Sequence, residues 1–111
     1  MDEQRARALL DDERRRIDSL LAHIGRDRAV EQFEATSLGD ATDAAQPLIS
    51  EQENDAIAAA LRLRLAAVER AEARLAAGTY GRSVRSGEVI PDERLLADPT
   101  AELTVDEAAQ G

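Results

Sequence analysis

The segment that decides the predicted fold is SEQENDAIAAALRLRLAAVERAEARLAAG, residues 50–78. Its first four residues have the Ser-x-x-Glu form of a capping box, which is typical of a helix start. Gly78 stands at the other end, where a left-handed glycine commonly ends a helix. Apolar residues between the two ends follow alternating spacings of three and four: Ile57, Leu61, Val68, Ala71 and Leu75, with Arg64 in the series. We therefore predict one helix from about residue 51 to residue 77.

A second long helix is predicted before this segment. Residues 2–36 consist largely of good helix formers and contain no proline. Leu10, Ile17 and Ile24 recur every seven residues and form one apolar stripe. Turn-forming residues follow, and Pro47 prevents a simple continuation into the next helix. Two long helices with matched apolar stripes bury them by packing as an antiparallel coiled coil. We therefore predict a mainly α fold built on a two-helix hairpin.

The rest of the chain, residues 79–111, carries different signals. Its Tyr-Gly, Ser-Gly and Ile-Pro pairs indicate turns or short strands. A lobe of about thirty residues is too small to be stable without a staple or a neighbour. We therefore predict two parts: a coiled-coil hairpin at residues 1–78, with a tip loop at about 37–50, and a small lobe at 79–111.

The composition excludes several classes of function. A net charge of −9 opposes nonspecific binding to nucleic acid and to anionic membranes. The chain has no cysteine, so neither a disulfide nor a thiolate metal site can form. No secretory signal and no apolar run near the ~20 residues of a membrane span are visible. No nucleophile–base pair, phosphate-binding glycine loop or conventional metal cluster is recognisable. We expect a cytoplasmic protein that is not an enzyme.

Acidic residues gather at the predicted tip. Between residues 29 and 61 the chain has seven acidic residues and no basic one. Within that stretch, Asp40-Ala41-Thr42-Asp43-Ala44-Ala45 matches the Asp-x-x-Asp-x-Ala tip motif of the DksA/TraR regulators of bacterial RNA polymerase, a family that the chain resembles from about residue 40 to its end. Twelve residues of the lobe also match that family's zinc finger in order: Gly78, Thr79, Tyr80, Gly81, Gly87, Ile90, Pro91, Arg94, Leu95, Ala97, Pro99 and Ala101.

The resemblance implies a hairpin followed by a four-cysteine zinc finger, but the four cysteines are replaced. Their positions hold Ser83, Ser86, Thr104 and Glu107. Zinc prefers thiolate or imidazole ligands, and three neutral hydroxyls with one carboxylate are a poor set. We therefore predict a degenerate, zinc-finger-like lobe without zinc. Hydrophobic packing is expected to hold the lobe instead, through Tyr80, Val84, Val89, Ile90, Leu95, Leu96, Leu103 and Val105.

In the DksA/TraR family the hairpin enters the secondary channel of RNA polymerase, where its aspartates approach the catalytic region. The resemblance implies a bacterial transcription regulator that binds polymerase core or holoenzyme through Asp40, Asp43 and Ala45. It implies no direct sequence-specific DNA binding, and we expect a monomer. Some members use ppGpp as a cofactor, held by basic residues. The corresponding positions here are Ala67, Asp98 and Ala108, none of which can pair with a phosphate, so we predict no ppGpp at that interface.

Three alternatives remain open. The two tip aspartates could merely cap helix ends, since Asp is a common capping residue. The chain could be a coiled-coil adaptor or a homodimeric interaction protein that does not act on polymerase. A transcript cleavage factor of the Gre type also carries acidic residues on a hairpin tip. This last class is less well supported, because those factors lack the Gly-Thr-Tyr-Gly…Ile-Pro…Arg-Leu pattern of the lobe.

Overall fold

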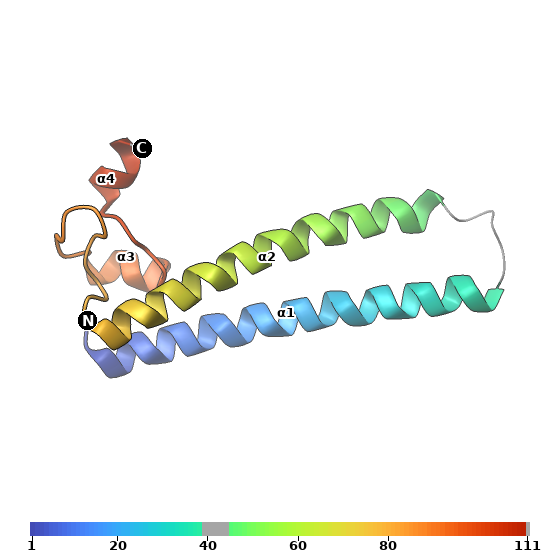
Figure 1. Cartoon of the computed structure of the whole chain (residues 1–111), viewed down its shortest axis with the longest axis horizontal. Coiled ribbons are helices and arrows are strands. Elements are labelled where there is room, and N and C mark those ends of the chain that lie inside the picture. Colours follow the sequence, from blue (N-terminus) through green and yellow to red (C-terminus); the bar gives the residue numbers. More distant parts are fainter. Residues whose placement is uncertain (39–44, 111) are drawn as a thin grey trace. The chain divides into compact units, whose positions relative to one another are not determined.

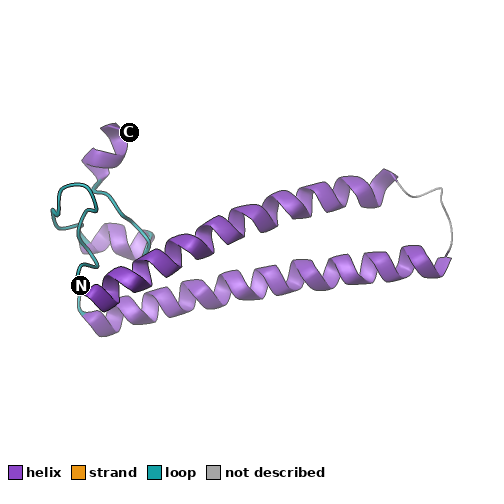
Figure 2. Cartoon of the chain, in the orientation of Figure 1, coloured by secondary structure: helices purple, strands orange, loops and turns teal. Residues whose placement is uncertain are grey.

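The computed structural model describes the backbone of residues 1–38 and 45–110, and the side chains of residues 1–25 and 52–110. Within these residues the chain forms two long helices, α1 (Glu3–Leu38) and α2 (Ala45–Ala77), and two short ones, α3 (Asp92–Ala97) and α4 (Val105–Gln110) (Figure 1). Figure 2 shows that the described residues between them are loops. One isolated antiparallel bridge joins Arg82 to Val89. The predicted mainly α fold, a helical hairpin followed by a small lobe, is confirmed.

The second helix begins earlier than predicted. α2 starts at Ala45, so residues 50–53 lie inside the helix and do not form its start. Pro47 is the third residue of α2. A proline is tolerated there, because the N–H groups of the first turn have no acceptor within the helix. At the other end, the predicted role of Gly78 is confirmed. Gly78 has φ +80, and the N–H of Thr79 donates to the carbonyl of Arg74 at 2.9 Å, which forms a Schellman cap.

The chain divides into two compact units, one made of Met1–Arg15 with Leu65–Gly111 and the other of Arg16–Arg64. In the first unit, Ala6 and Leu10 of α1 are buried, as are Val68 and Ala71 of α2. An ion pair accompanies this seam: Arg14 donates from Nη2 to Glu72 Oε1 at 2.7 Å and from Nε to Glu72 Oε2 at 3.3 Å. The seam of the first unit therefore combines small apolar residues with a two-point Arg–carboxylate contact.

In the second unit, Ile17 of α1 and Ala58 of α2 are the buried apolar residues among those whose side chains are described. The predicted stripe is wrong at one position here, because Ile57 is 52% exposed. Among the α2 side chains described in this unit, Ala58 is buried and Leu61 is half-buried. Alanine at this position suits a narrow seam, since a small side chain allows two helices to approach closely.

The lobe has a small apolar centre. Ile90, Leu95 and Ala101 form its buried cluster, against which Met1 and Tyr80 pack. The N-terminal amino group of Met1 also lies 3.0 Å from Asp92 Oδ1. The prediction that a longer set of apolar residues holds the lobe is wrong for four members, which are exposed: Val84, Val89, Leu96 and Val105. Their segments are loops or short helices with one face to solvent, so polar contacts must contribute to the lobe's cohesion.

We predict that Leu10→Ala destabilises the protein by about 2–5 kcal/mol, because it removes a fully buried side chain and leaves a cavity in the seam. Urea denaturation followed by circular dichroism would measure the change. The matched control is Leu63→Ala, which truncates a leucine that is 74% exposed and should alter the free energy of unfolding by less than about 0.5 kcal/mol. Equal effects of the two substitutions would contradict this assignment of the seam.

We predict that Gly25→Ala stabilises the protein by about 0.5–1 kcal/mol, because alanine lowers the entropy of the unfolded chain and favours the helix. Gly25 lies within α1, and a Cβ atom added there meets nothing within 4 Å. Gly78→Ala is the matched control and should destabilise, because its φ of +80 strains any residue with a Cβ. Thermal unfolding of both variants would test the opposite signs.

Candidate functional site

Two of the three residues predicted at the hairpin tip, Asp40 and Asp43, lie outside the described residues. The third, Ala45, is the first residue of α2, and its side chain is not among those described. The functional role of these three residues stays a prediction. The structure does describe the four positions of the degenerate zinc finger, and it brings all four together.

Ser83 and Ser86 organise the first of two turns in the lobe. The hydroxyl oxygen of Ser83 accepts hydrogen bonds from the backbone N–H groups of Arg85, at 3.1 Å, and of Ser86, at 3.2 Å. The hydroxyl oxygen of Ser86 in turn accepts a bond from the N–H of Glu88 at 3.3 Å. Ser83 is 5% exposed, so its hydroxyl replaces water as the partner of two backbone donors.

Thr104 and Glu107 form the second turn, which starts α4. The N–H of Thr104 donates to Glu107 Oε1 at 3.0 Å, and the N–H of Glu107 donates to Thr104 Oγ1 at 3.2 Å. This reciprocal arrangement is a capping box, with threonine at the N-cap and glutamate three residues later. It fixes the direction in which the Glu107 side chain leaves the helix.

The Glu107 carboxylate lies close enough to the first turn for the hydroxyls of Ser83 and Ser86 to lower its pKa. The Ser83 hydroxyl is the largest influence that lowers the pKa of Glu107, followed by the backbone N–H of Thr104. Partial loss of water acts in the opposite direction, and the pKa falls from its ordinary 4.5 to about 2. We call these four residues the clasp.

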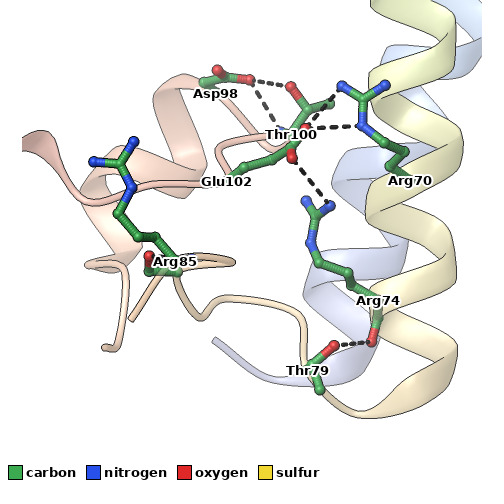
Figure 3. Close-up of polar contacts among 8 residues, drawn as sticks. Arg70, Arg74, Thr79, Arg85, Asp98, Thr100 and Glu102 are labelled. Carbon is green, nitrogen blue, oxygen red and sulfur yellow. Dashed lines mark hydrogen bonds and ion pairs between the residues drawn. The ribbon is translucent and has the colours of Figure 1, made fainter. Parts of the chain in front are cut away.

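A second polar cluster attaches the lobe to α2. Arg70 donates from both Nε, at 3.0 Å, and Nη2, at 2.8 Å, to Glu102 Oε1. Arg74 Nη1 lies 4.0 Å from the other oxygen of Glu102, and Figure 3 shows both arginines extending from α2 toward it. Two further nitrogens of Arg74, Nε and Nη2, are buried without a hydrogen-bond partner. The backbone carbonyl of Glu102 accepts the N–H of Val84 at 2.8 Å. Glu102 therefore contacts α2 and the first turn of the clasp at the same time.

Sequence reasoning missed the attachment through Glu102. Arg70 and Arg74 are four residues apart, so they share one face of α2. That spacing was the available signal, but it does not name a partner. Glu102 lies 32 residues from Arg70 in the chain, and their contact follows from the tertiary fold alone.

Comparison with known proteins identifies one solved structure to which the chain is similar. No family model and no curated protein matches the chain. Among solved structures, the chain is similar to the transcription factor DksA2 from Pseudomonas aeruginosa, with 26% sequence identity and a TM-score of 0.61. The match covers 93% of this chain and 82% of that one. This chain has a DksA/TraR-like fold.

The DksA/TraR-like fold implies zinc at the four clasp positions, but the donors present do not fit it. Structural zinc sites use thiolate, imidazole or carboxylate ligands in a tetrahedron. Three of the four donors here are neutral hydroxyls, and each already takes part in hydrogen bonds. Among the residues whose side chains are described, no group of three or more His, Cys, Asp or Glu could hold a metal ion. That the lobe folds without zinc stays a prediction, which elemental analysis of the purified protein tests.

The positions that correspond to ppGpp contacts in the DksA/TraR family carry no basic side chain. Ala67 is half-buried on α2, and Ala108 is exposed on α4. Asp98 serves the lobe itself: its Oδ1 accepts bonds from the N–H of Thr100, at 3.0 Å, and from the Thr100 hydroxyl, at 2.8 Å (Figure 3). A carboxylate at this position would repel a phosphate. The expected absence of ppGpp at this interface stays a prediction.

We predict that Glu107 makes the stability of the protein depend on acid pH. Its folded-state pKa of about 2 is below the ordinary 4.5, so its contribution is fully present above about pH 4.5 and is lost as the pH falls toward 2. The melting temperature of wild type should exceed that of Glu107→Gln at neutral pH, and the difference should shrink below pH 4.5. Glu88→Gln, which removes an exposed carboxylate from the neighbouring loop, is the control. A difference that does not change with pH would contradict the prediction.

Proposed function

We propose that this protein is a DksA-like transcription regulator of bacterial RNA polymerase. It binds core or holoenzyme and inserts its acidic tip into the secondary channel, where it modulates initiation. The observation that carries the proposal is the likeness to the transcription factor DksA2 over 93% of the chain, combined with the Asp-x-x-Asp-x-Ala motif at residues 40–45. The factor acts as a monomer in the cytoplasm.

The long helices give a physical reason for this mode of action. At about 1.5 Å per residue, the 33 residues of α2 extend for about 50 Å. An element only two helices wide suits a channel too narrow for a globular domain. The segment from residue 29 to residue 61 has seven acidic residues and no basic one, so it carries a strongly negative charge. In this proposal Asp40 and Asp43 act on the metal-containing catalytic region of the polymerase.

A regulatory role agrees with the rest of the chain better than a catalytic one. DksA-like folds belong to regulatory factors, and we propose that this chain is not an enzyme. Its net charge of −9 opposes direct binding to DNA, where basic residues must neutralise phosphates. Among the described residues, no helix is long and apolar enough to cross a membrane. The polymerase is thus the partner through which the protein affects transcription.

We predict that Asp40→Asn combined with Asp43→Asn keeps polymerase binding but abolishes the effect on transcription. The double substitution removes two negative charges from the tip while preserving side-chain size. Gel filtration with core polymerase would measure binding, and transcription in vitro from a responsive promoter would measure the effect. Glu53→Gln combined with Asp55→Asn is the matched control, since it removes the same charge from the same segment outside the motif.

Two outcomes would contradict the proposed function. Unchanged promoter activity of the Asp40/Asp43 variant would show that the aspartates do not act, as expected if they only cap helix ends. Failure of the wild-type protein to bind polymerase, together with a dimer by light scattering, would favour a coiled-coil adaptor. Cleavage of the nascent transcript in a stalled complex would instead indicate a factor of the Gre type.

A further inference from the structure

We propose that Arg74 forms a binding site for a small oxyanion, such as phosphate or acetate, where α2 meets the lobe. The anion is held by the Nε and Nη2 groups of the Arg74 side chain. The inference starts from hydrogen-bond donors that are buried without an acceptor. It does not depend on the proposed function, and it uses none of the three positions compared above with ppGpp contacts.

The Arg74 side chain has two buried donors that make no hydrogen bond, Nε and Nη2. Its remaining nitrogen, Nη1, lies 4.0 Å from Glu102 Oε2, which allows an ion pair but is too long for a hydrogen bond. The side chain is 14% exposed. Burying a guanidinium group costs free energy unless its charge is paired and its N–H groups are bonded. The two donors therefore require an acceptor.

Nε and Nη2 belong to one edge of the planar guanidinium group. Their N–H bonds run nearly parallel, which matches two oxygens of a carboxylate or a phosphate. Two other arginines of the same unit use this edge for an acid. Arg14 donates from Nε and Nη2 to the two oxygens of Glu72, and Arg70 donates from the same pair to Glu102 Oε1. Among these three arginines, Arg74 is the one whose edge has no acid on it.

Glu102 does not supply the missing acceptor. Its Oε1 receives both bonds from Arg70, and its Oε2 faces Nη1 of Arg74. Figure 3 shows both arginines reaching this carboxylate, while Asp98, another acid drawn there, directs its Oδ1 to Thr100. Two guanidinium groups thus share the Glu102 carboxylate. An added anion would pair with the second charge and accept both free N–H groups.

The helix end explains an arginine at this position but not its burial. Arg74 lies in the last turn of α2, where the helix dipole favours a cation. That attraction does not require the guanidinium to leave water. Because both free nitrogens are covered, a ligand must displace the groups that cover them, and a small ion needs the smallest displacement. The site therefore fits an inorganic or short organic oxyanion better than a larger molecule.

The experiment uses the full chain and follows the arginine Nε–H resonances by NMR during a titration with sodium phosphate. Ionic strength is kept constant with chloride, and the buffer contains no other oxyanion. The Arg74 resonance is expected to shift and to saturate at millimolar phosphate, because its N–H gains an ionised acceptor. The resonances of Arg14 and Arg70 are internal controls and should shift much less, since carboxylates already occupy their edges.

Two further titrations define the ligand. Acetate offers the same pair of oxygens with less charge, so the tighter of the two anions identifies the source as a phosphate or a carboxylate. Chloride without either anion should leave the Arg74 resonance in place. An Arg74 resonance that does not respond to phosphate or acetate, or that responds equally to chloride, would overturn the proposal.

A conservative variant tests the role of the planar edge. Arg74→Lys keeps the positive charge but removes the two parallel donors, so it should weaken phosphate binding by about tenfold or more. Arg15→Lys changes an exposed arginine of α1 and is the matched control, which should bind as wild type does. Binding is measured as the rise in melting temperature with phosphate. Phosphate stabilises folded proteins in general, so an equal rise in wild type and Arg74→Lys would contradict the proposal.

A third variant tests whether Glu102 itself fills the edge in solution, which a rotation of its side chain could achieve. Glu102→Gln removes the negative charge that competes with an added anion. Under the proposal, phosphate binds wild type and binds Glu102→Gln at least as tightly. If phosphate binds Glu102→Gln but not wild type, Glu102 is the acceptor for Arg74 and the proposal is wrong.

Discussion

The lobe cannot be held by its own apolar centre, because Ile90, Leu95 and Ala101 are the members of its buried cluster. Burial of so few side chains cannot offset the conformational entropy of ordering about thirty residues. The remaining cohesion comes from polar contacts and from neighbouring elements. The Tyr80 hydroxyl donates to the carbonyl of Pro99 at 2.8 Å, and Arg94 Nε donates to the carbonyl of Leu103 at 2.8 Å. The shortage of apolar burial thus explains why the lobe relies on the clasp, on α2 and on Met1.

Sequence predictions of burial and capping were correct where a repeating or local pattern exists, and wrong in the lobe, where none does. Leu10, Ile17, Val68 and Ala71 were predicted correctly, because a heptad stripe reports burial wherever two long helices pack. Gly78 was predicted correctly, because the left-handed C-cap is a local requirement. The exposed valines of the lobe were not, because a segment of loops and single turns has no repeating face from which burial can be read.

The candidate site shows a similar division between local and tertiary information. The resemblance to a zinc finger pointed to Ser83, Ser86, Thr104 and Glu107, and the structure brings them together. It did not indicate the hydrogen bonds that these side chains make with the backbone of their own turns. The contact between Glu102 and Arg70 depends on the packing of the lobe against α2, which no local pattern encodes. The proposed role of the tip residues Asp40 and Asp43 is based on the sequence motif alone.

The division of the chain into Met1–Arg15 with Leu65–Gly111, and Arg16–Arg64, has a consequence for folding during synthesis. The residues that complete the first unit are separated widely in sequence: Arg14 pairs with Glu72 across 58 positions, and Met1 packs on the centre of the lobe. Residues 1–15 therefore lack their partners until residues 65–111 have been synthesised. Residues 16–64 have their contacts available much sooner. Because contacts between distant residues form slowly, the last step of folding is expected to bring together the two separate segments of the first unit.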